Sequence, residues 1–527
     1  MPTASFSSLL SEELYTCFVV FFRTNVLVFD KNVYLCTRVP PPLRTGYLIM
    51  KKEISFAGCV IGGAVATIAP AQQKVKTGWD KQPNVIYIMA DDLGIGDIEP
   101  YGQTQIKTPN LNKMRERGMR FTQCYAGTAV SAPSRCSLMT GLHTGHASVR
   151  GNIGVDPEGQ VPMPAGTFTM ATMFKASGYA TGCFGKWGLG YPGSVSDPTQ
   201  VGFDRFFGYN CQTLAHDYYP DHLWDGTQRI NLPQNYEQRE VTYSADTIHA
   251  EALKFMRAHA DRPFFTFLSY TIPHAELILP HDSVYQAYCQ QIPLEDEVPF
   301  VQKNPNKKGA YGSTPRPMAS FAAMVTRLDR YVGDVMNLLD SLGIADNTIL
   351  IFTSDNGPHK EGGANPDYFK SYGPYRGIKR DLYEGGIRMP MLISCPGHVA
   401  AGVDNDHVMA FWDMLPTFAE AIGYQQPLTT DGISFLPTLL GKEGQQEHRY
   451  LYWEFHEKLG KQAVRLGYWK GIRLNVADQP VFELYDLRTD IHEDNNIAAQ
   501  HPDVVRQLES LIDSCHIHSD VFNFGRK

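Results

Sequence analysis

The sequence lacks a long run of basic residues, and its 55 acidic residues outnumber its 47 lysines and arginines, for a formal net charge of -8. This balance argues against nucleic acid as the main partner. Internal repeats and low-complexity tracts are also missing, and 43% of the residues are hydrophobic, which is typical of a packed globular protein. A chain of 527 residues exceeds what one core usually holds, so we expect a large domain and a smaller one.

Closely spaced cysteines are lacking. Seven of the ten cysteines lie beyond residue 71, at positions 124, 136, 183, 211, 289, 395 and 515. An odd number of widely spaced cysteines matches neither a disulfide framework nor a zinc site. We therefore expect most of them to be small buried apolar residues.

A full-length transmembrane run is also lacking, because charged residues interrupt the apolar stretch near the N terminus. Met50-Lys51-Lys52 begins a segment with a basic start, a short apolar run and a small-residue cleavage site after Ala71, the three parts of a secretory signal. We predict that residues 1–49 are an upstream artefact, that residues 50–71 are a signal peptide, and that the mature chain is periplasmic or secreted. Lipidation at Cys59 is the less favoured alternative.

Two apolar runs end in oxygen-bearing side chains. Residues 84–90 precede Asp91 and Asp92, and residues 348–353 lead to Asp355 and Asn356. Such a pair after one strand is more often a turn or a helix cap. Two pairs at strand ends favour a metal site instead, because open α/β sheets carry their sites at the carboxyl ends of strands and hard oxygen donors suit Ca²⁺ or Mg²⁺.

The alternation of strands and helices predicts an α/β fold with helices on both faces of a large sheet, which we expect to be mixed. Besides the two runs above, we expect helices over residues 167–176, 244–259 and 324–342, and a strand over 263–270. Later in the chain we expect a helix over 411–422, short strands over 450–455, 463–466, 470–474 and 481–486, and a helix over 502–515. This pattern predicts a catalytic α/β domain over 80–396 and a C-terminal subdomain over 397–527, with a small antiparallel sheet plus a helix packed on the first.

A candidate nucleophile lies in the stretch Ser131-Ala132-Pro133-Ser134-Arg135, where a loop is expected to enter a helix. Pro133 suits a first helical turn, where its missing N–H costs nothing, and free backbone amides there would face an anion. We interpret Ser131 as the position of the nucleophile.

Residues 131–141 resemble the signature of the type I sulfatases, whose nucleophile is a formylglycine (3-oxoalanine) made after translation from Cys or Ser. Further blocks similar to the family occur in order at residues 84–94, 178–187, 273–274, 354–357, 376–379 and 384–390. The resemblance covers residues 84–516 and implies a sulfuric ester hydrolase with an alkaline-phosphatase-like fold. It also implies a serine-type bacterial member, matured at Ser131 by a radical S-adenosylmethionine enzyme. Cys136 lacks the proline and arginine at the required spacing, so we interpret it as a packing residue.

The resemblance implies a role for each motif residue. Asp91, Asp92, Asp355 and Asn356 would bind calcium, with the modified Ser131 completing the set. Arg135 would hold the formylglycine, and Lys186, His274 and Lys379 would neutralise the sulfate oxygens, with His274 or Lys379 protonating the leaving oxygen. The hydrated aldehyde would attack sulfur, and its second hydroxyl would then release the sulfate. Taken singly, each of these residues would more often be an exposed lysine, an ordinary loop histidine or an arginine paired with a surface carboxylate. The occurrence of all the motifs in the family's order favours an active site.

One position departs from the family. Many members have a histidine two residues after the lysine that matches Lys186, where this sequence has Gly188. Either another group such as His216 does that work, or the subgroup arranges the step differently, or activity is reduced. We favour a subgroup difference, because every other charged member of the set is present.

Residues 206–224 and 358–375 lie next to motif residues and carry aromatic and histidine side chains suited to sugar rings, so we predict that His216 and His359 contact substrate. The expected substrate is a sulfated saccharide. Two alternatives stay open: a phosphodiesterase or phosphonate hydrolase of the same superfamily, and a non-catalytic protein that binds sulfated glycans.

Overall fold

The computed structural model describes residues 18–22, 25–30, 33–38, 78–304 and 309–525, and the chain divides into two compact units, 1–72 and 73–527. The first unit holds an antiparallel sheet of β1 (Phe18–Phe22), β2 (Asn25–Asp30) and β3 (Val33–Arg38). These strands fall within the segment predicted to be an upstream artefact, which stays a prediction. The predicted signal peptide lies outside the described residues.

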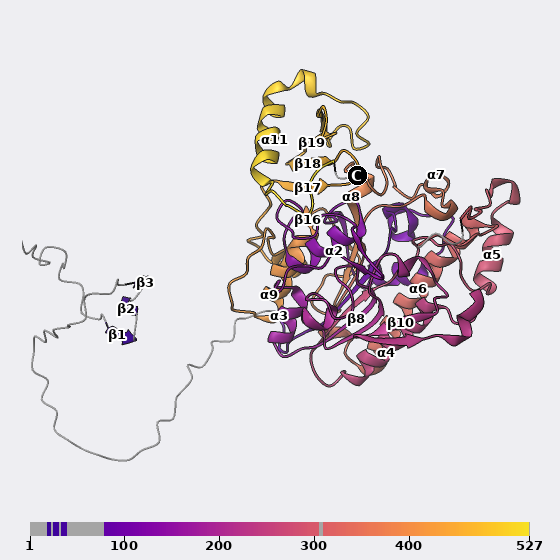
Figure 1. The fold of residues 1–527 in the computed structure, drawn as a ribbon, viewed down its shortest axis with the longest axis horizontal. Helices are drawn as coiled ribbons and strands as arrows, with labels where there is room; N and C mark the ends of the chain where they lie inside the picture. Colours follow the sequence, from indigo (N-terminus) through magenta and orange to yellow (C-terminus); the bar gives the residue numbers. More distant parts are fainter. Residues whose placement is uncertain (1–17, 23–24, 31–32, 39–77, 305–308, 526–527) are drawn as a thin grey trace, which may run out of the picture. The chain divides into compact units, whose positions relative to one another are not determined.

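An 11-stranded mixed sheet forms the centre of the second unit (Figure 1). Its order is β11-β10-β9-β8-β12-β4-β13-β14-β5-β15, with β16 also beside β5. The bounds are β4 (Asn84–Ala90), β5 (Gly118–Tyr125), β8 (Ala180–Lys186), β9 (Arg205–Tyr209), β10 (His222–Asp225), β11 (Gln228–Asn231), β12 (Phe264–Ser269), β13 (Thr348–Ser354), β14 (Arg388–Ser394), β15 (Val403–Asn405) and β16 (Met409–Ala410). Strands β9, β8, β12, β4 and β13 run parallel, whereas β10 and β14 join antiparallel, so the predicted large mixed sheet is confirmed.

Helices cover both faces of this sheet. Their bounds are α1 (Pro109–Glu116), α2 (Ser131–Thr140), α3 (Met170–Ala176), α4 (Ser244–Ala258), α5 (Ser283–Gln291), α6 (Pro317–Leu342), α7 (Pro366–Phe369), α8 (Glu384–Ile387), α9 (Met414–Ile422), α10 (Leu436–Leu439) and α11 (Pro502–Cys515). The predicted helices over 167–176, 244–259 and 324–342 appear as α3, α4 and α6. Helix α6 begins earlier than predicted, at Pro317, because proline is favoured in a first turn. Helix α3 begins later, after Thr169 accepts a hydrogen bond from Thr172 N.

Strand β4 shows why the sheet needs a layer of helices on each face. Every one of its residues is buried. Side chains alternate across a strand, so Ile86 and Ile88 join the core beneath α4 and α6, whereas Val85, Tyr87 and Met89 join the core beneath α3 and α9. A strand buried on both faces reads as a continuous apolar run, which is the pattern the sequence has here.

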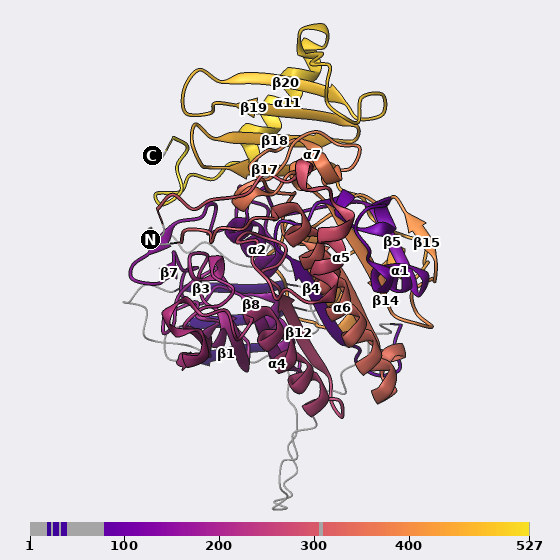
Figure 2. The same ribbon diagram turned by 90° about the vertical axis from the view of Figure 1, so that its right-hand side faces the viewer.

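A second, four-stranded antiparallel sheet follows: β17 (Leu451–Phe455), β18 (Lys461–Leu466), β19 (Trp469–Leu474) and β20 (Val481–Asp486), with α11 beside it (Figure 2). All four strands and α11 match the prediction. Tyr452 and Val464 share a core with residues of α11. Leu451 and Trp453 lie in another core, which includes Val130 from the main part of the second unit. Strands β15 and β16 lie beyond residue 396 yet belong to the large sheet, and the domain division at that residue stays a prediction.

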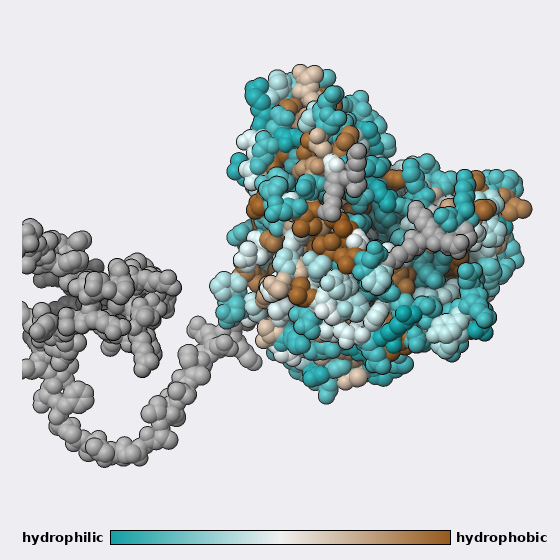
Figure 3. Space-filling model, in the orientation of Figure 1, coloured by the Kyte–Doolittle hydropathy of each residue, from teal (hydrophilic) through white to brown (hydrophobic). Residues whose placement is uncertain are grey.

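The described surface and cysteines agree with a packed globular chain. The face of the second unit drawn in Figure 3 is mainly hydrophilic. Six of the seven cysteines described beyond residue 78 are buried, as predicted. Within the described ranges, none of the helices combines the length and apolar character needed to cross a bilayer.

Candidate active site

Four neighbouring parallel strands deliver the predicted site residues to one edge of the large sheet. Lys186 is the last residue of β8, and Asp91 with Asp92 directly follows β4. Asp355 with Asn356 follows β13, and His274 follows β12. All of these side chains are buried. Strands β4 and β13 pair directly, so the Asp91-Asp92 and Asp355-Asn356 pairs lie at the carboxyl ends of adjacent strands.

Helix α2 begins at Ser131 and presents its hydroxyl to this edge. Ser131 Oγ donates a hydrogen bond to Asp91 Oδ1 (3.1 Å), and Lys186 Nζ lies 3.5 Å from the same hydroxyl. Lys186 Nζ also contacts Asp91 Oδ2. The next backbone amide, Ala132 N, donates to Asn152 Oδ1 (3.1 Å). The candidate nucleophile is thus held between a carboxylate and an ammonium group.

Arg135 lies one helical turn after Ser131 and faces the same cluster. Its Nη2 and Nε donate to Asp355 Oδ2 (2.8 and 3.1 Å), and its Nη1 donates to the Lys186 carbonyl oxygen (3.1 Å). Burial raises the pKa of Asp355, and the nearby Asp91 carboxylate raises it further, whereas the Arg135 charge opposes both. Arg135 therefore links α2 to the ends of β8 and β13.

Lys379 closes the other side of the cluster. Its Nζ donates to Asp92 Oδ2 (2.7 Å) and lies 2.9 Å from His274 Nε2. Burial, followed by the charges of Lys379 and Lys186, holds the pKa of His274 well below its usual value. His274 Nδ1 contacts the Ala275 carbonyl oxygen, which places the ring proton there and leaves Nε2 as an acceptor for Lys379. Burial lowers the pKa of Lys379, but the Asp92 and Glu361 carboxylates outweigh it and raise the pKa.

The donor set fits a hard divalent cation. Asp91, Asp92 and Asp355 bring three buried carboxylates together, with Asp92 N donating to Asp355 Oδ1 (3.0 Å). Asn356 Nδ2 donates to Asp92 Oδ1 (2.6 Å), whereas its Oδ1 is buried and has no hydrogen-bond partner among the described residues. A buried oxygen left over beside three carboxylates is what Ca²⁺ or Mg²⁺ would take up, and these ligands suit neither zinc nor copper.

The two predicted substrate-contacting histidines both lie at this site. His216, in a short 3-10 helix over Leu214–His216, stacks on His274 with ring centroids 5.2 Å apart. His359 is buried, also stacks on His274 with ring centroids 5.4 Å apart, and contacts Glu361. Glu361 also pairs with Lys379 (3.8 Å), a link the sequence pattern did not reveal. Substrate contact by the two histidines stays a prediction.

The space beside Gly188 is filled by a residue that sequence reasoning missed. Gly188 has φ +76, and a Cβ built there would lie 2.4 Å from Gln212 Nε2. Gln212 Nε2 is buried without a hydrogen-bond partner among the described residues. Strand β8 pairs with β9, so the segments following these strands run together and bring the two residues into contact. Replacement of the family histidine by His216 is one of three alternatives, and the favoured one is a subgroup difference; none of them is tested by this geometry, and Gln212 is the side chain found against Gly188.

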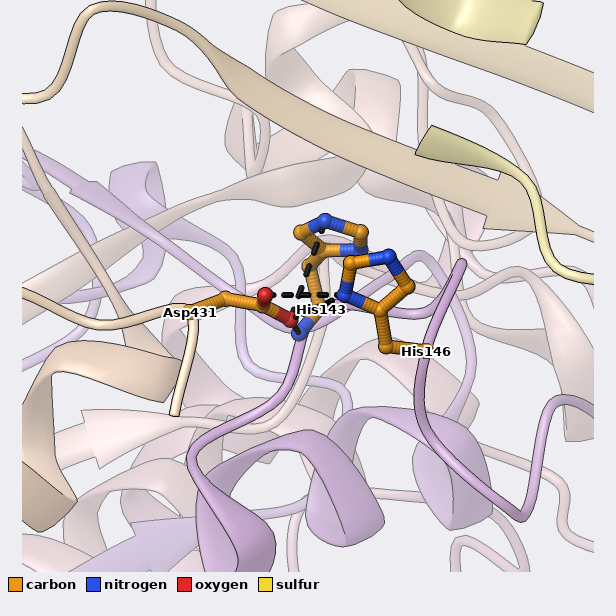
Figure 4. A group of neighbouring side chains, drawn as sticks. All are labelled: His143, His146 and Asp431. Carbon is orange, nitrogen blue, oxygen red and sulfur yellow. Dashed lines mark hydrogen bonds and ion pairs between the residues drawn. The ribbon is translucent and has the colours of Figure 1, made fainter. Parts of the chain in front are cut away.

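A separate His and Asp cluster lies beyond the other end of α2 (Figure 4). His146 Nδ1 lies 2.8 Å from Asp431 Oδ1, and His143 Nε2 lies 3.7 Å from Asp431 Oδ2. His143 Nδ1 accepts a hydrogen bond from Gly145 N (3.2 Å), so the neutral ring carries its proton on Nε2. If a metal bound Nε2 while Nδ1 accepts from Gly145 N, neither ring nitrogen would carry a proton and the ring would be an anion. Metal-bound histidines are normally neutral and donate a hydrogen bond from the nitrogen that does not bind the metal. We interpret this group as a structural hydrogen-bonded cluster and not as a metal site.

Comparison with known proteins agrees with this geometry. A family model described as Sulfatase matches residues 83–424. The chain belongs to the sulfatase family. It is therefore a sulfuric ester hydrolase, and a second model, described as N-sulphoglucosamine sulphohydrolase, C-terminal, matches residues 375–517.

Relatives cover most of this sulfatase. An N-acetylgalactosamine-6-O-sulfatase of Bacteroides thetaiotaomicron is 30% identical over 85% of this chain and 97% of its own length. Arylsulfatase A of Homo sapiens is 29% identical over 82% and 87%. The crystal structure of Ps i-CgsB in complex with k-i-k-neocarrahexaose has a TM-score of 0.69 at 25% identity, covering 85% of this chain and 96% of that one. A phosphonate monoester hydrolase of Agrobacterium radiobacter, at 21% identity and a TM-score of 0.56, shares the alkaline-phosphatase-like fold.

Proposed function

We propose that this sulfatase removes O-sulfate from a sulfated saccharide, using a formylglycine derived from Ser131 and a calcium ion bound by Asp91, Asp92, Asp355 and Asn356. The observation that carries the proposal is the position of Ser131 Oγ, 3.1 Å from Asp91 at the edge of a buried group of three carboxylates. The saccharide substrate is supported by the names of the relatives, which include an N-acetylgalactosamine sulfatase, and by the carrahexaose bound to a protein of the same fold.

The aldehyde supplies a hydrate hydroxyl as nucleophile, and the calcium ion supplies positive charge beside it. The chain's own residues do the rest. Asp91 orients the group at position 131, while Lys186 stabilises negative charge next to it. His274 is neutral and accepts from Lys379 on the opposite side, so we assign protonation of the leaving oxygen to Lys379.

Maturation and export follow from the same proposal. A serine at position 131 requires a radical S-adenosylmethionine maturase acting before export, and the signal peptide predicted over residues 50–71 fits a periplasmic or secreted enzyme. Magnesium is the second choice of metal, because the same oxygen ligands bind it when the cavity is small.

The test is expression with and without a serine-type maturase, followed by two measurements. Mass spectrometry of the Ser131 peptide should show the loss of two hydrogens only with the maturase, and sulfate release from a panel of sulfated saccharides should follow that conversion. Ser131→Ala should abolish release, whereas the exposed Ser341→Ala should not. Fully active protein with unmodified serine would contradict the mechanism. Hydrolysis of phosphate or phosphonate esters by that unmodified protein would support the phosphonate-hydrolase alternative, and saccharide binding without turnover would support the glycan-binding one.

A further inference from the structure

A tyrosine outside every sequence motif lies against the neutral His274. Tyr311 belongs to the segment that precedes α6, and its ring centroid lies 5.9 Å from that of His274 and 4.8 Å from that of His216. The His216 ring is itself stacked on His274, with 12° between the two planes. Tyr311 and His216 together therefore cover His274 from two separate parts of the chain.

Hydrogen bonds on both sides of Tyr311 fix its segment to the site. His216 Nδ1 donates to the Gly309 carbonyl oxygen (3.0 Å), and Gly312 N donates to Glu276 Oε2 (2.9 Å). One anchor stands two residues before Tyr311 and the other directly follows it. The backbone at Tyr311 cannot leave the site without breaking one of these bonds.

The buried Glu276 carboxylate joins the three segments that carry these rings. Glu276 stands two residues after His274, and its Oε1 accepts a hydrogen bond from Tyr218 N (2.8 Å), two residues after His216. Its other oxygen holds the segment of Tyr311. A buried carboxylate that accepts from two backbone amides is a rigid link, because each lost bond would leave a buried polar group unpaired. The fold therefore builds the position of Tyr311 over His274.

The Tyr311 hydroxyl is available to a ligand. The side chain is half-buried, and its hydroxyl makes no hydrogen bond to another described residue. Burial raises the pKa of Tyr311 to about 12; the Lys379 charge opposes this shift, whereas the Glu361 and Asp92 carboxylates add to it. The hydroxyl thus lies within reach of the charges of the active site, and at neutral pH it keeps its proton and can act as a donor.

We propose that the Tyr311 hydroxyl donates a hydrogen bond to the leaving oxygen of the sulfate ester, beside Lys379. The inference rests on the proposed function for the assignment of Lys379 as proton donor. When the bond between sulfur and the leaving oxygen breaks, its electron pair stays on that oxygen and Lys379 supplies the proton. Tyr311 keeps its own proton and stabilises the negative charge that develops there.

The test compares the matured wild type with Tyr311→Phe and with the control Tyr468→Phe, an exposed tyrosine in the turn between β18 and β19. The substrates are phenyl sulfate and para-nitrophenyl sulfate, which are similar in size but differ in leaving group, and the panel of sulfated saccharides. Tyr311→Phe should lower kcat about tenfold for phenyl sulfate and for the saccharides, which corresponds to one hydrogen bond to a charged group. For para-nitrophenyl sulfate the loss should be less than about twofold, because its anion needs little stabilisation.

KM should change by less than about twofold for every ester, because the contact strengthens only as charge develops in the transition state. Tyr468→Phe should match the wild type throughout. A purely structural defect in Tyr311→Phe would lower the turnover of both aryl esters by the same factor, so the ratio of the two separates the proposed contact from a loss of folded protein.

Equal kcat of Tyr311→Phe and the wild type for phenyl sulfate would overturn the inference, as would an equal loss for the two aryl esters or an effect confined to KM. The proposed function fails by a different result: sulfate release from the aryl esters but from none of the saccharides. The two aryl esters would then still decide on Tyr311. No release from any ester by the matured wild type would refute both.

Discussion

Among the single residues of the site, Gly188 offers a sharp test because its lack of a side chain makes room for Gln212. Gly188→Ala puts a Cβ into the left-handed region and 2.4 Å from Gln212 Nε2. We expect backbone strain of about 1 kcal/mol and, because Gln212 must move, a fall in turnover of at least tenfold. Gly178→Ala, at φ +85 with nothing within 4 Å, introduces the same strain without a neighbour.

Both variants should therefore lose a similar amount of thermal stability in differential scanning fluorimetry, but only Gly188→Ala should lose sulfatase activity. Equal activity in the two would show that Gln212 has no part in the reaction. Gln212 could not be predicted from the sequence, because nothing in residues 186–190 or 209–213 signals that the segments after β8 and β9 meet.

Three carboxylates buried within one cluster give a prediction about metal. A cation that binds the folded protein and not the unfolded chain stabilises the folded state, so bound Ca²⁺ should stabilise the protein. We expect chelation to lower the melting temperature and added Ca²⁺ to restore it. Asp355→Asn should lose both the bound metal, measured by elemental analysis, and this response. Asp340→Asn, in an exposed pair with Arg117, should keep both. Full calcium occupancy in Asp355→Asn would place the site elsewhere.

Helix α2 carries the proposed nucleophile at its first residue, and the hydrogen-bonded cluster of His143, His146 and Asp431 lies just beyond its other end. Burial lowers the pKa of His143 to about 4, although Asp431 opposes this shift. The ring is neutral in the folded state, whereas in the unfolded chain it takes up a proton near pH 6.5. The unfolded state therefore gains stability as the pH falls from 6.5 to 4, at a cost to folding of about 3 kcal/mol by the lower pH.

His143→Gln should remove this contribution. The stability of the wild type should fall more steeply between pH 7 and pH 4 than that of the variant, in urea unfolding at a series of pH values. His492→Gln, where the histidine is exposed and pairs with Asp494, should leave the steepness unchanged. If the free energies of unfolding of His143→Gln and the wild type changed in parallel with pH, the folded protein would not keep His143 neutral.

The elements that position the site were predictable where the signal was local. Strands β4 and β13 are continuous apolar runs followed by paired oxygen donors, so both their type and their ends could be read from the sequence. The order of blocks that resembles the sulfatases then implied which charged residues belong to the site. Contacts made by unrelated segments could not be predicted, because they depend on the strand order: Asn152 beneath Ala132 and Glu361 beside Lys379 are examples.

The two sheets of the second unit share a core next to Ser131. Val130, the residue before Ser131, packs with Leu451 and Trp453 of β17. Lys470 of β19 is fully buried, and its Nζ donates to Glu384 Oε1 (2.8 Å) and lies 3.5 Å from Glu493 Oε1. Burial would raise the pKa of Glu384, but the Lys470 and Arg388 charges outweigh it and hold the value at about 2.

Lys470→Met should therefore leave two buried carboxylates without their shared cation and destabilise the protein by about 3–5 kcal/mol. Because the shared core includes Val130, the residue before Ser131, we expect the two sheets to unfold in one calorimetric transition and activity to be lost together with it. Lys461→Met, which removes a partly exposed pair with Asp381, should cost about 1 kcal/mol or less. Two separate transitions in Lys470→Met, with activity following only the one at higher temperature, would show that the small sheet does not support the nucleophile.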